Sequence, residues 1–144
     1  MDPNFYWIHL GLGRVYVQKK MYRNAISSLE RAAELSGNNA MVLSELGHAY
    51  GMAGRRRDAQ RILVKLQKES QRRYVSAYDL GLVYVGLGQR EEALQWFEKA
   101  YRDHCRNLQF SGVEPRLDPL RNDVHFQNLT KRLNLPVQTV TAAR

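Results

Sequence analysis

Residues that could bind a metal, attack a substrate or hold a phosphate are present in the chain but scattered. The candidates are His9, His48, His104, His125, Cys105, the glycines of Gly11-Leu12-Gly13 and Gly86-Leu87-Gly88, and Ser27, Ser28, Ser36 and Ser44. The histidines lack ligand spacing. The glycine pairs lack the preceding strand and third glycine of a dinucleotide loop, and no serine lies in a nucleophile elbow. We therefore expect a protein without catalytic residues, metal or cofactor.

The elements that would position functional residues follow an internal period of 34 residues instead. The recurring sets are Leu12, Leu46 and Leu80; Gly13, Gly47 and Gly81; Tyr16, Tyr50 and Tyr84; Ala25, Ala59 and Ala93; Leu29, Leu63 and Phe97; Ala32, Leu66 and Ala100. A period of this length is typical of a solenoid of stacked units, none of which can bury its apolar face alone. Function is then expected on a surface rather than in a cleft.

The repeated positions resemble the tetratricopeptide repeat family, whose unit is about 34 residues long. The resemblance implies an all-α, right-handed α-solenoid of three helix-turn-helix units plus a C-terminal capping helix. The expected units are 6–39, 40–73 and 74–107, and the expected helices lie near 5–18, 22–35, 39–52, 56–69, 74–86 and 90–104.

Small residues are interpreted as helix-packing and turn positions. The repeated glycines leave room where a first helix approaches a second, and the repeated alanines are expected to give the matching small surface opposite. Gly54 and Gly88 fall in the turns between helices, where a positive φ ends a helix at low cost. The first repeat departs from this pattern, with Lys20 at that place.

The two ends of the chain are interpreted as different kinds of boundary. Pro3 lies where the closing proline of a preceding repeat would fall, so 1–5 is expected to be the tail of an absent upstream repeat. The alternative is a native start with a helix-entry signal. Asp123 is expected to cap a last helix near 124–133 within a loop and capping region at 108–136. Residues 137–144 are expected to be a disordered tail.

The C-terminal third carries a looser resemblance to the arrays that end multidomain bacterial regulators. It depends on the segments 73–78 and 117–123, on Phe126-Gln127 and on Leu135-Pro136. In such proteins the array follows a winged-helix, adenylate-cyclase or serine/threonine-kinase domain. The resemblance implies what lies upstream in a parent protein and leaves the partner open.

Composition narrows the class of protein further. At 144 residues and 44% apolar content, the chain suits one domain. No apolar run approaches the roughly 20 residues of a membrane span, and no signal peptide precedes the repeats. One cysteine excludes an internal disulfide framework, so a reducing compartment is the simplest context. We expect a cytoplasmic protein.

The family resemblance implies a concave groove lined by the first helix of each unit. The implied groove residues are Trp7, Leu10, Arg14, Val17, Gln18, Met41, Ser44, Glu45, His48, Met52, Val75, Tyr78, Asp79, Leu82 and Val85. The alternative is that some of them pack against neighbouring helices or the C-terminal helix. Glu45 and Asp79 fall where modules that hold chaperone C-terminal tails carry basic or amide residues. That partner is not expected, and a ligand with apolar anchors and a basic residue is favoured.

The net charge of +8 has a local source between Arg55 and Arg73, which holds eight basic and two acidic residues. Five of them share one face of the expected helix, and we call them the basic stripe: Arg57, Arg61, Lys65, Lys68 and Arg72. The stripe is expected on the convex side, as a solvated face or as a contact for phosphates, an acidic domain or an anionic membrane. Nucleic acid is less favoured because no aromatic residues interleave the stripe.

These features predict a non-catalytic protein–protein interaction module that binds a peptide or helix in its groove. The alternative is an electrostatic adaptor that contacts nucleic acid or an acidic partner through the basic stripe. An uncovered first repeat, with Phe5, Tyr6, Trp7 and Ile8 close to its apolar face, also predicts self-association end to end.

Overall fold

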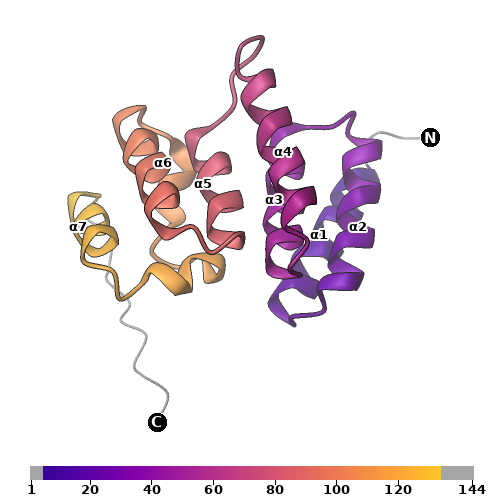
Figure 1. Cartoon of the computed structure of the whole chain (residues 1–144), viewed down its shortest axis with the longest axis horizontal. Helices are drawn as coiled ribbons and strands as arrows, with labels where there is room; N and C mark the ends of the chain where they lie inside the picture. Colours follow the sequence, from indigo (N-terminus) through magenta and orange to yellow (C-terminus); the bar gives the residue numbers. More distant parts are fainter. Residues whose placement is uncertain (1–4, 134–144) are drawn as a thin grey trace.

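A computed structural model describes residues 5–133, and every regular element in that range is helical. The elements in chain order are α1 (Tyr6–Gln18), α2 (Tyr22–Leu35), α3 (Ala40–Met52), α4 (Arg56–Glu69), α5 (Ala77–Gly86), α6 (Arg90–Arg102), the short 3-10 helices η2 (Arg106–Phe110) and η3 (Pro115–Leu120), and α7 (Val124–Arg132) (Figure 1). The expectations for residues 1–4 and 137–144 lie outside the described range.

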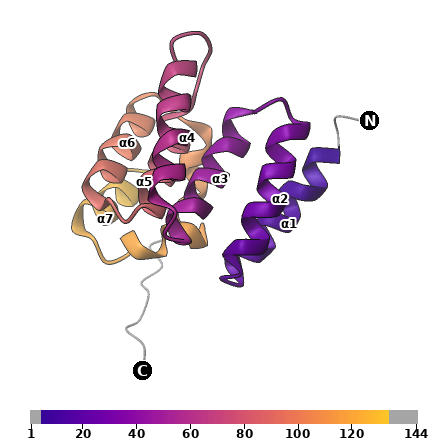
Figure 2. The ribbon, with the colours of Figure 1, turned by 45° about the vertical axis from the view of Figure 1, so that its right-hand side comes forward.

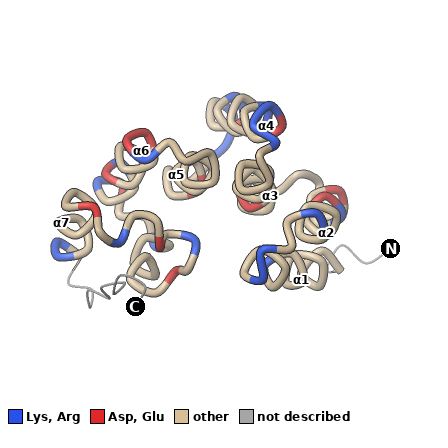
Figure 3. Tube along the Cα trace, turned by 60° about the horizontal axis from the view of Figure 1, so that its bottom comes forward, with Lys and Arg blue, Asp and Glu red and all other residues tan. Residues whose placement is uncertain are grey.

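The helices form an arc of three antiparallel pairs, α1–α2, α3–α4 and α5–α6 (Figures 1 and 2). The first helix of each pair lies on the inner side of the arc and the second on the outer side (Figure 3). The segment that joins α6 to α7 folds back onto the inner side beneath α5, and α7 closes the end next to α6. The expected all-α solenoid of helix-turn-helix repeats is confirmed.

Local capping explains where the helices begin and end. Ser76 accepts a hydrogen bond from the backbone N–H of Tyr78 at 3.2 Å, so α5 begins at Ala77 rather than at 74 as expected. Val75 therefore precedes the helix instead of facing the groove from it. Helix α6 ends at Arg102, two residues before the predicted end at 104, because His104 adopts a φ of 55°.

The turns between paired helices share one backbone conformation. Gly54 and Gly88 have φ values of 80° and 73°, as expected for glycines that end helices. Lys20 occupies the same place in the first repeat and has a φ of 59° without being a glycine. The repeat geometry therefore prevails over the residue preference at this turn.

Packing within each pair departs from the sequence interpretation in one respect. A Cβ atom built on Gly13 would lie 2.6 Å from the Leu29 side chain, and one on Gly81 would lie 2.5 Å from the Phe97 ring. Gly13 and Gly81 thus make room for a large residue of the second helix, not for the repeated alanines, whereas Gly47 makes room for Ile62 of α4 and Val83 of α5. Leu29 and Phe97 are fully buried in the core, so the glycines allow dense packing between paired helices.

The two junctions between repeats are built differently. A Cβ atom on Gly51 of α3 would lie 2.4 Å from the carbonyl carbon of Gly86 in α5, so these two helices meet backbone to backbone. One period earlier, the equivalent residues are Val17 and Met52. On the side of the first repeat, α3 packs mainly against α2. The first junction thus has two residues with side chains at the positions where the second junction has two glycines.

None of the described helices is long and apolar enough to cross a membrane.

Candidate functional site

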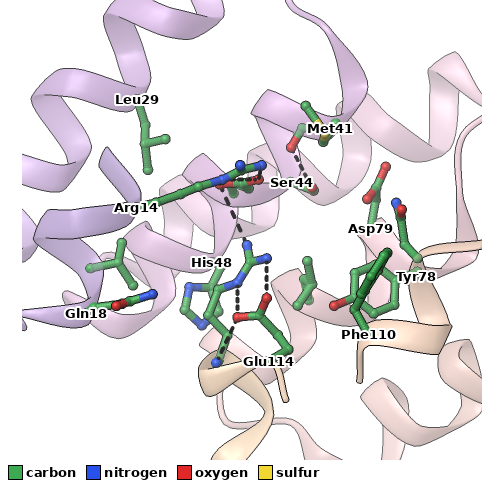
Figure 4. Close-up of a pocket in the computed structure, with 15 residues that line it drawn as sticks. Arg14, Gln18, Leu29, Met41, Ser44, His48, Tyr78, Asp79, Phe110 and Glu114 are labelled. Atoms are coloured by element: carbon green, nitrogen blue, oxygen red, sulfur yellow. Dashed lines mark hydrogen bonds and ion pairs between the residues drawn. The ribbon is translucent and has the colours of Figure 1, made fainter. Parts of the chain in front are cut away.

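A cavity of about 360 Å³ lies on the inner side of the arc. Helices α1, α3 and α5 form one wall, and the segment between α6 and α7 forms the other with Asn107, Phe110, Glu114 and Arg116 (Figure 4). We call the first junction the open junction, because it lacks the glycine pair that brings two helices into backbone contact. The cavity therefore lies between this open junction and a part of the chain outside the repeated units.

Most of the expected groove residues line this cavity. Those that do are Arg14, Val17, Gln18, Met41, Ser44, Glu45, His48, Tyr78, Asp79 and Leu82. The other five expected residues are placed elsewhere. Leu10 is fully buried in the core, Trp7 and Met52 are exposed near the start of α1 and at the end of α3, and Val75 precedes α5. Val85 is also buried, in the core shared with α6.

The chain's own C-terminal segment occupies part of the inner side of the arc. This segment is anchored by Leu108, Leu117 and Leu120, which are buried against α5 and α6. Arg121 holds its backbone by donating hydrogen bonds to the carbonyl oxygens of Ser111 at 2.5 Å and Glu114 at 2.8 Å. The segment is thus a fixed wall of the cavity.

Two arginines from opposite walls converge on the buried carboxylate of Glu45, which is 5% exposed. Arg14 of α1 donates from Nε to Oε2 at 2.9 Å, and the Nη1 atom of Arg116 lies 3.7 Å from the same oxygen. Arg116 in turn donates from Nε to Oε1 of Glu114 at 2.9 Å. Glu45 therefore has basic partners within the same chain: Arg14 belongs to the first repeat, whereas Arg116 follows the last repeat and is outside the 34-residue period.

These charges shift one another's pKa in the direction of ionisation. Hydrogen bonding to Glu45 raises the pKa of Arg14 against the opposing effect of burial. Burial opposes ionisation of Glu114 and Arg116, but their mutual hydrogen bonds prevail, with Glu45 adding to the effect on Arg116, so the pKa of Glu114 falls and that of Arg116 rises. Glu114 and the two arginines therefore stay charged across the physiological pH range.

Asp79 occupies the position of Glu45 one repeat later but lacks an equivalent partner. Its residue is 6% exposed, and no hydrogen bond or ion pair joins its carboxylate to another described residue. Burial and the nearby charge of Glu45 raise its pKa to about 6, while Arg116 opposes them. Asp79 is thus a buried carboxylate, on the cavity wall, that titrates near neutrality.

His48 is the second polar side chain of the cavity that lacks a partner. It is 2% exposed, and its Nδ1 atom is fully enclosed without a hydrogen bond to any described residue. Burial lowers its pKa to about 3, with Arg116 contributing, so the imidazole is neutral at physiological pH. Figure 4 shows the ring beside Glu114 at the base of the cavity.

The basic stripe lies away from the cavity, on the outer side of the arc (Figure 3). All five side chains are exposed, and the carboxylate of Asp58 contacts Arg61 at 3.5 Å. Val64 is exposed beside them on α4. The stripe therefore presents a cationic surface to solvent.

The first repeat exposes a face that the later repeats bury. Ile8, Leu12 and Val15 of α1 are each about half exposed. Their equivalents one and two periods later are buried: Val42, Leu46, Ala49, Ser76, Leu80 and Val83. Preceding helices cover those later positions, so the first repeat leaves an apolar face without a covering helix in the described chain.

Comparison with known families identifies the repeats. Models described as tetratricopeptide repeat match residues 8–39, 40–65 and 75–110. The chain belongs to the tetratricopeptide repeat family. Tetratricopeptide repeats generally mediate protein–protein interactions, and the family is a non-catalytic interaction scaffold. No curated protein and no solved structure significantly matches the chain. Within the described residues, no group of histidine, cysteine and acidic side chains could hold a metal.

Proposed function

We propose that this tetratricopeptide array is a non-catalytic module that binds a partner peptide or helix in the cavity of its concave face. The supporting observation is the cavity itself, which combines apolar side chains of three helices with charged groups at the open first junction. Val17, Met41 and Tyr78 offer apolar contacts, while Arg14 is 45% exposed at the edge of the ion-pair network. This mixture of apolar anchors and a few polar groups suits peptide recognition.

The wider setting is also a proposal. The resemblance of the C-terminal segments to bacterial regulators supports an array that follows a regulatory domain in a larger cytoplasmic protein. The partner is not the acidic tail of a chaperone, because the two carboxylates of Glu45 and Asp79 would repel it.

The experiment is a selection of dodecapeptides from a random phage-displayed library against the purified full chain. Gln18→Trp places an indole in the cavity from an exposed position, whereas Gln60→Trp makes the same change on the outer face of α4. Selected peptides should lose about tenfold in affinity or more for the first variant and keep it for the second, because only the first blocks the cavity. Absence of enriched peptides, or equal binding to both variants, would exclude the proposed groove function.

A second proposal is an electrostatic contact through the basic stripe, supported by the exposure of all five side chains, four on α4 and Arg72 in the turn that follows it. Arg61→Glu should then weaken binding to an acidic partner or to nucleic acid, with a steep dependence on salt. Binding that is insensitive to salt and to this substitution would argue against the stripe and for the groove.

Self-association is a third proposal, supported by the difference in burial between Leu12 and its repeat equivalents. Leu12→Lys should shift any dimer to monomer in sedimentation velocity, because it places a charge in the apolar face. A monomer at every concentration of the unmodified chain would dismiss this proposal.

A further inference from the structure

We infer that the cavity receives a lysine or arginine side chain of the partner peptide, with its charged group placed against the Asp79 carboxylate. This inference depends on the proposed groove function and specifies the chemistry of the ligand. It follows from a comparison of two equivalent acidic residues in successive repeats.

Glu45 and Asp79 are separated by one period and line the same cavity. Glu45 is bridged by a guanidinium of α1 and by a guanidinium of η3. Asp79 as a residue is buried to a similar extent and has neither, and its unpaired carboxylate oxygens are not among the fully enclosed atoms, so the cavity reaches them. Because a buried carboxylate without a partner costs free energy, the site is completed by a ligand that brings hydrogen-bond donors and a positive charge.

The charge balance of the cavity favours a cation over an anion. Two arginines and three carboxylates line it, namely Arg14, Arg116, Glu45, Glu114 and Asp79. When all are ionised, one negative charge remains, because the imidazole of His48 is neutral. Both arginines already pair with glutamates, so a phosphate or carboxylate would face three acidic groups without a free cation. A single ammonium or guanidinium group neutralises the cavity.

The enclosed Nδ1 of His48 is an independent sign of an incomplete polar site. Buried polar atoms are nearly always paired in folded proteins, and this one is not paired with any described residue. Because this atom is enclosed, it marks an incomplete polar site without itself contacting the partner. Asp79 alone supplies the charge recognition.

Binding should then depend on the ionisation of Asp79. The groups that act on this carboxylate are Glu45 of α3 and Arg116 of η3, while Tyr78 adjoins it on α5. With a pKa of about 6, the carboxylate is mostly protonated at pH 5 and mostly ionised at pH 7. A cationic ligand should therefore bind about tenfold more tightly at pH 7 than at pH 5.

The first test repeats the dodecapeptide selection against the wild type, Asp79→Asn, and the control Asp103→Asn, which removes an exposed carboxylate that follows α6 and does not line the cavity. A lysine or arginine should be enriched at one fixed position for the wild type and the control, and not for Asp79→Asn. Enriched peptides without such a position would overturn the inference and leave the groove function standing. A library that yields no enriched peptide removes both.

The second test measures the carboxyl carbon of Asp79 by NMR in the unmodified full chain during a pH titration. Millimolar Nα-acetyl-lysine methylamide is the probe, and the norleucine analogue is its uncharged control. The lysine probe should lower the pKa of Asp79, because it binds the ionised form, and the norleucine probe should not. A titration curve that neither probe moves, or that both move equally, would overturn the inference.

Discussion

The two junctions between repeats differ although the same period generates both. At the second junction, Gly51 and Gly86 bring the backbones of α3 and α5 into contact. At the first, Val17 and Met52 occupy the equivalent places, and a cavity lies beside α1. Two small residues thus decide which junction closes. The difference shows that a regular solenoid can have a cavity beside the junction that lacks close backbone packing.

The two junctions also differ in whether the acidic residue of the groove is paired with an arginine. The open junction is bridged by the ion pair of Arg14 with Glu45, whereas Asp79 faces the cavity from the closed junction without such a partner. The position of Arg14 is occupied one period later by His48, so α3 offers Asp79 no guanidinium group. Close backbone packing at one junction therefore goes together with an unpaired carboxylate in the cavity.

The largest expected effect comes from opening the closed junction. Gly51→Ala should destabilise the fold by about 3 kcal/mol, because its Cβ would lie 2.4 Å from backbone that cannot rotate away. Gly11→Ala is the matched control, since a Cβ there meets nothing within 4 Å. It should raise the free energy of unfolding by up to about 1 kcal/mol, because alanine favours the helix more than glycine does. Urea unfolding measures both. Similar stabilities for the two variants would refute the close approach.

His48 should make the fold less stable in acid. In the folded state this imidazole stays neutral down to about pH 3. In the unfolded chain it takes up a proton near the ordinary histidine pKa of 6.5. Between these values the unfolded state binds more protons, so stability falls as pH falls, by about 2 kcal/mol from pH 7 to pH 5. His48→Leu should abolish this loss in urea unfolding at the two pH values, whereas His125→Leu, at an exposed site, should retain it. An unchanged pH dependence in His48→Leu would contradict the assignment.

Asp79 should act in the opposite direction and more weakly. Its pKa of about 6 in the folded state exceeds the ordinary aspartate pKa of 3.8, which applies to the unfolded chain. The folded state therefore binds more protons between these two pH values. The stability it contributes is present at low pH and is lost as pH rises through about 6, by about 1 kcal/mol from pH 5 to pH 7. Asp79→Asn should therefore raise stability at pH 7 relative to pH 5, compared with wild type. The reverse sign in urea unfolding would show that the carboxylate is paired in the folded state.

The sequence predicted the repeats because small and apolar residues recur at fixed spacing, and each recurrence reports the same local packing. It also predicted most residues of the cavity wall, since Glu45, His48 and Asp79 hold defined places in the period. The start of α5 was misjudged because Ser76 caps it, a hydrogen bond that periodicity does not encode.

The second wall of the cavity could not be predicted in the same way. Phe110, Glu114 and Arg116 follow the last repeat, so their place depends on how the chain turns back after α6. That return is set by buried leucines and by the hydrogen bonds of Arg121, which join residues without a common period. The acidic pair in the groove predicted a ligand with a basic residue, which stays a prediction, and it did not indicate that Arg14 and Arg116 of the same chain pair with Glu45.

The smallest effect concerns the turn that ends the first helix beside the open junction. Lys20 has a φ of 59°, which costs a non-glycine residue free energy, whereas the later repeats have Gly54 and Gly88 there. Lys20→Gly should raise the free energy of unfolding by about 0.5 kcal/mol, because relief of this strain exceeds the added entropy of the unfolded chain. Lys19→Gly, at a neighbouring position with a φ of −82°, should instead lower it. If both variants were destabilised equally in urea unfolding, the first turn would differ from the other two, and the repeat geometry would not extend to the end of α1.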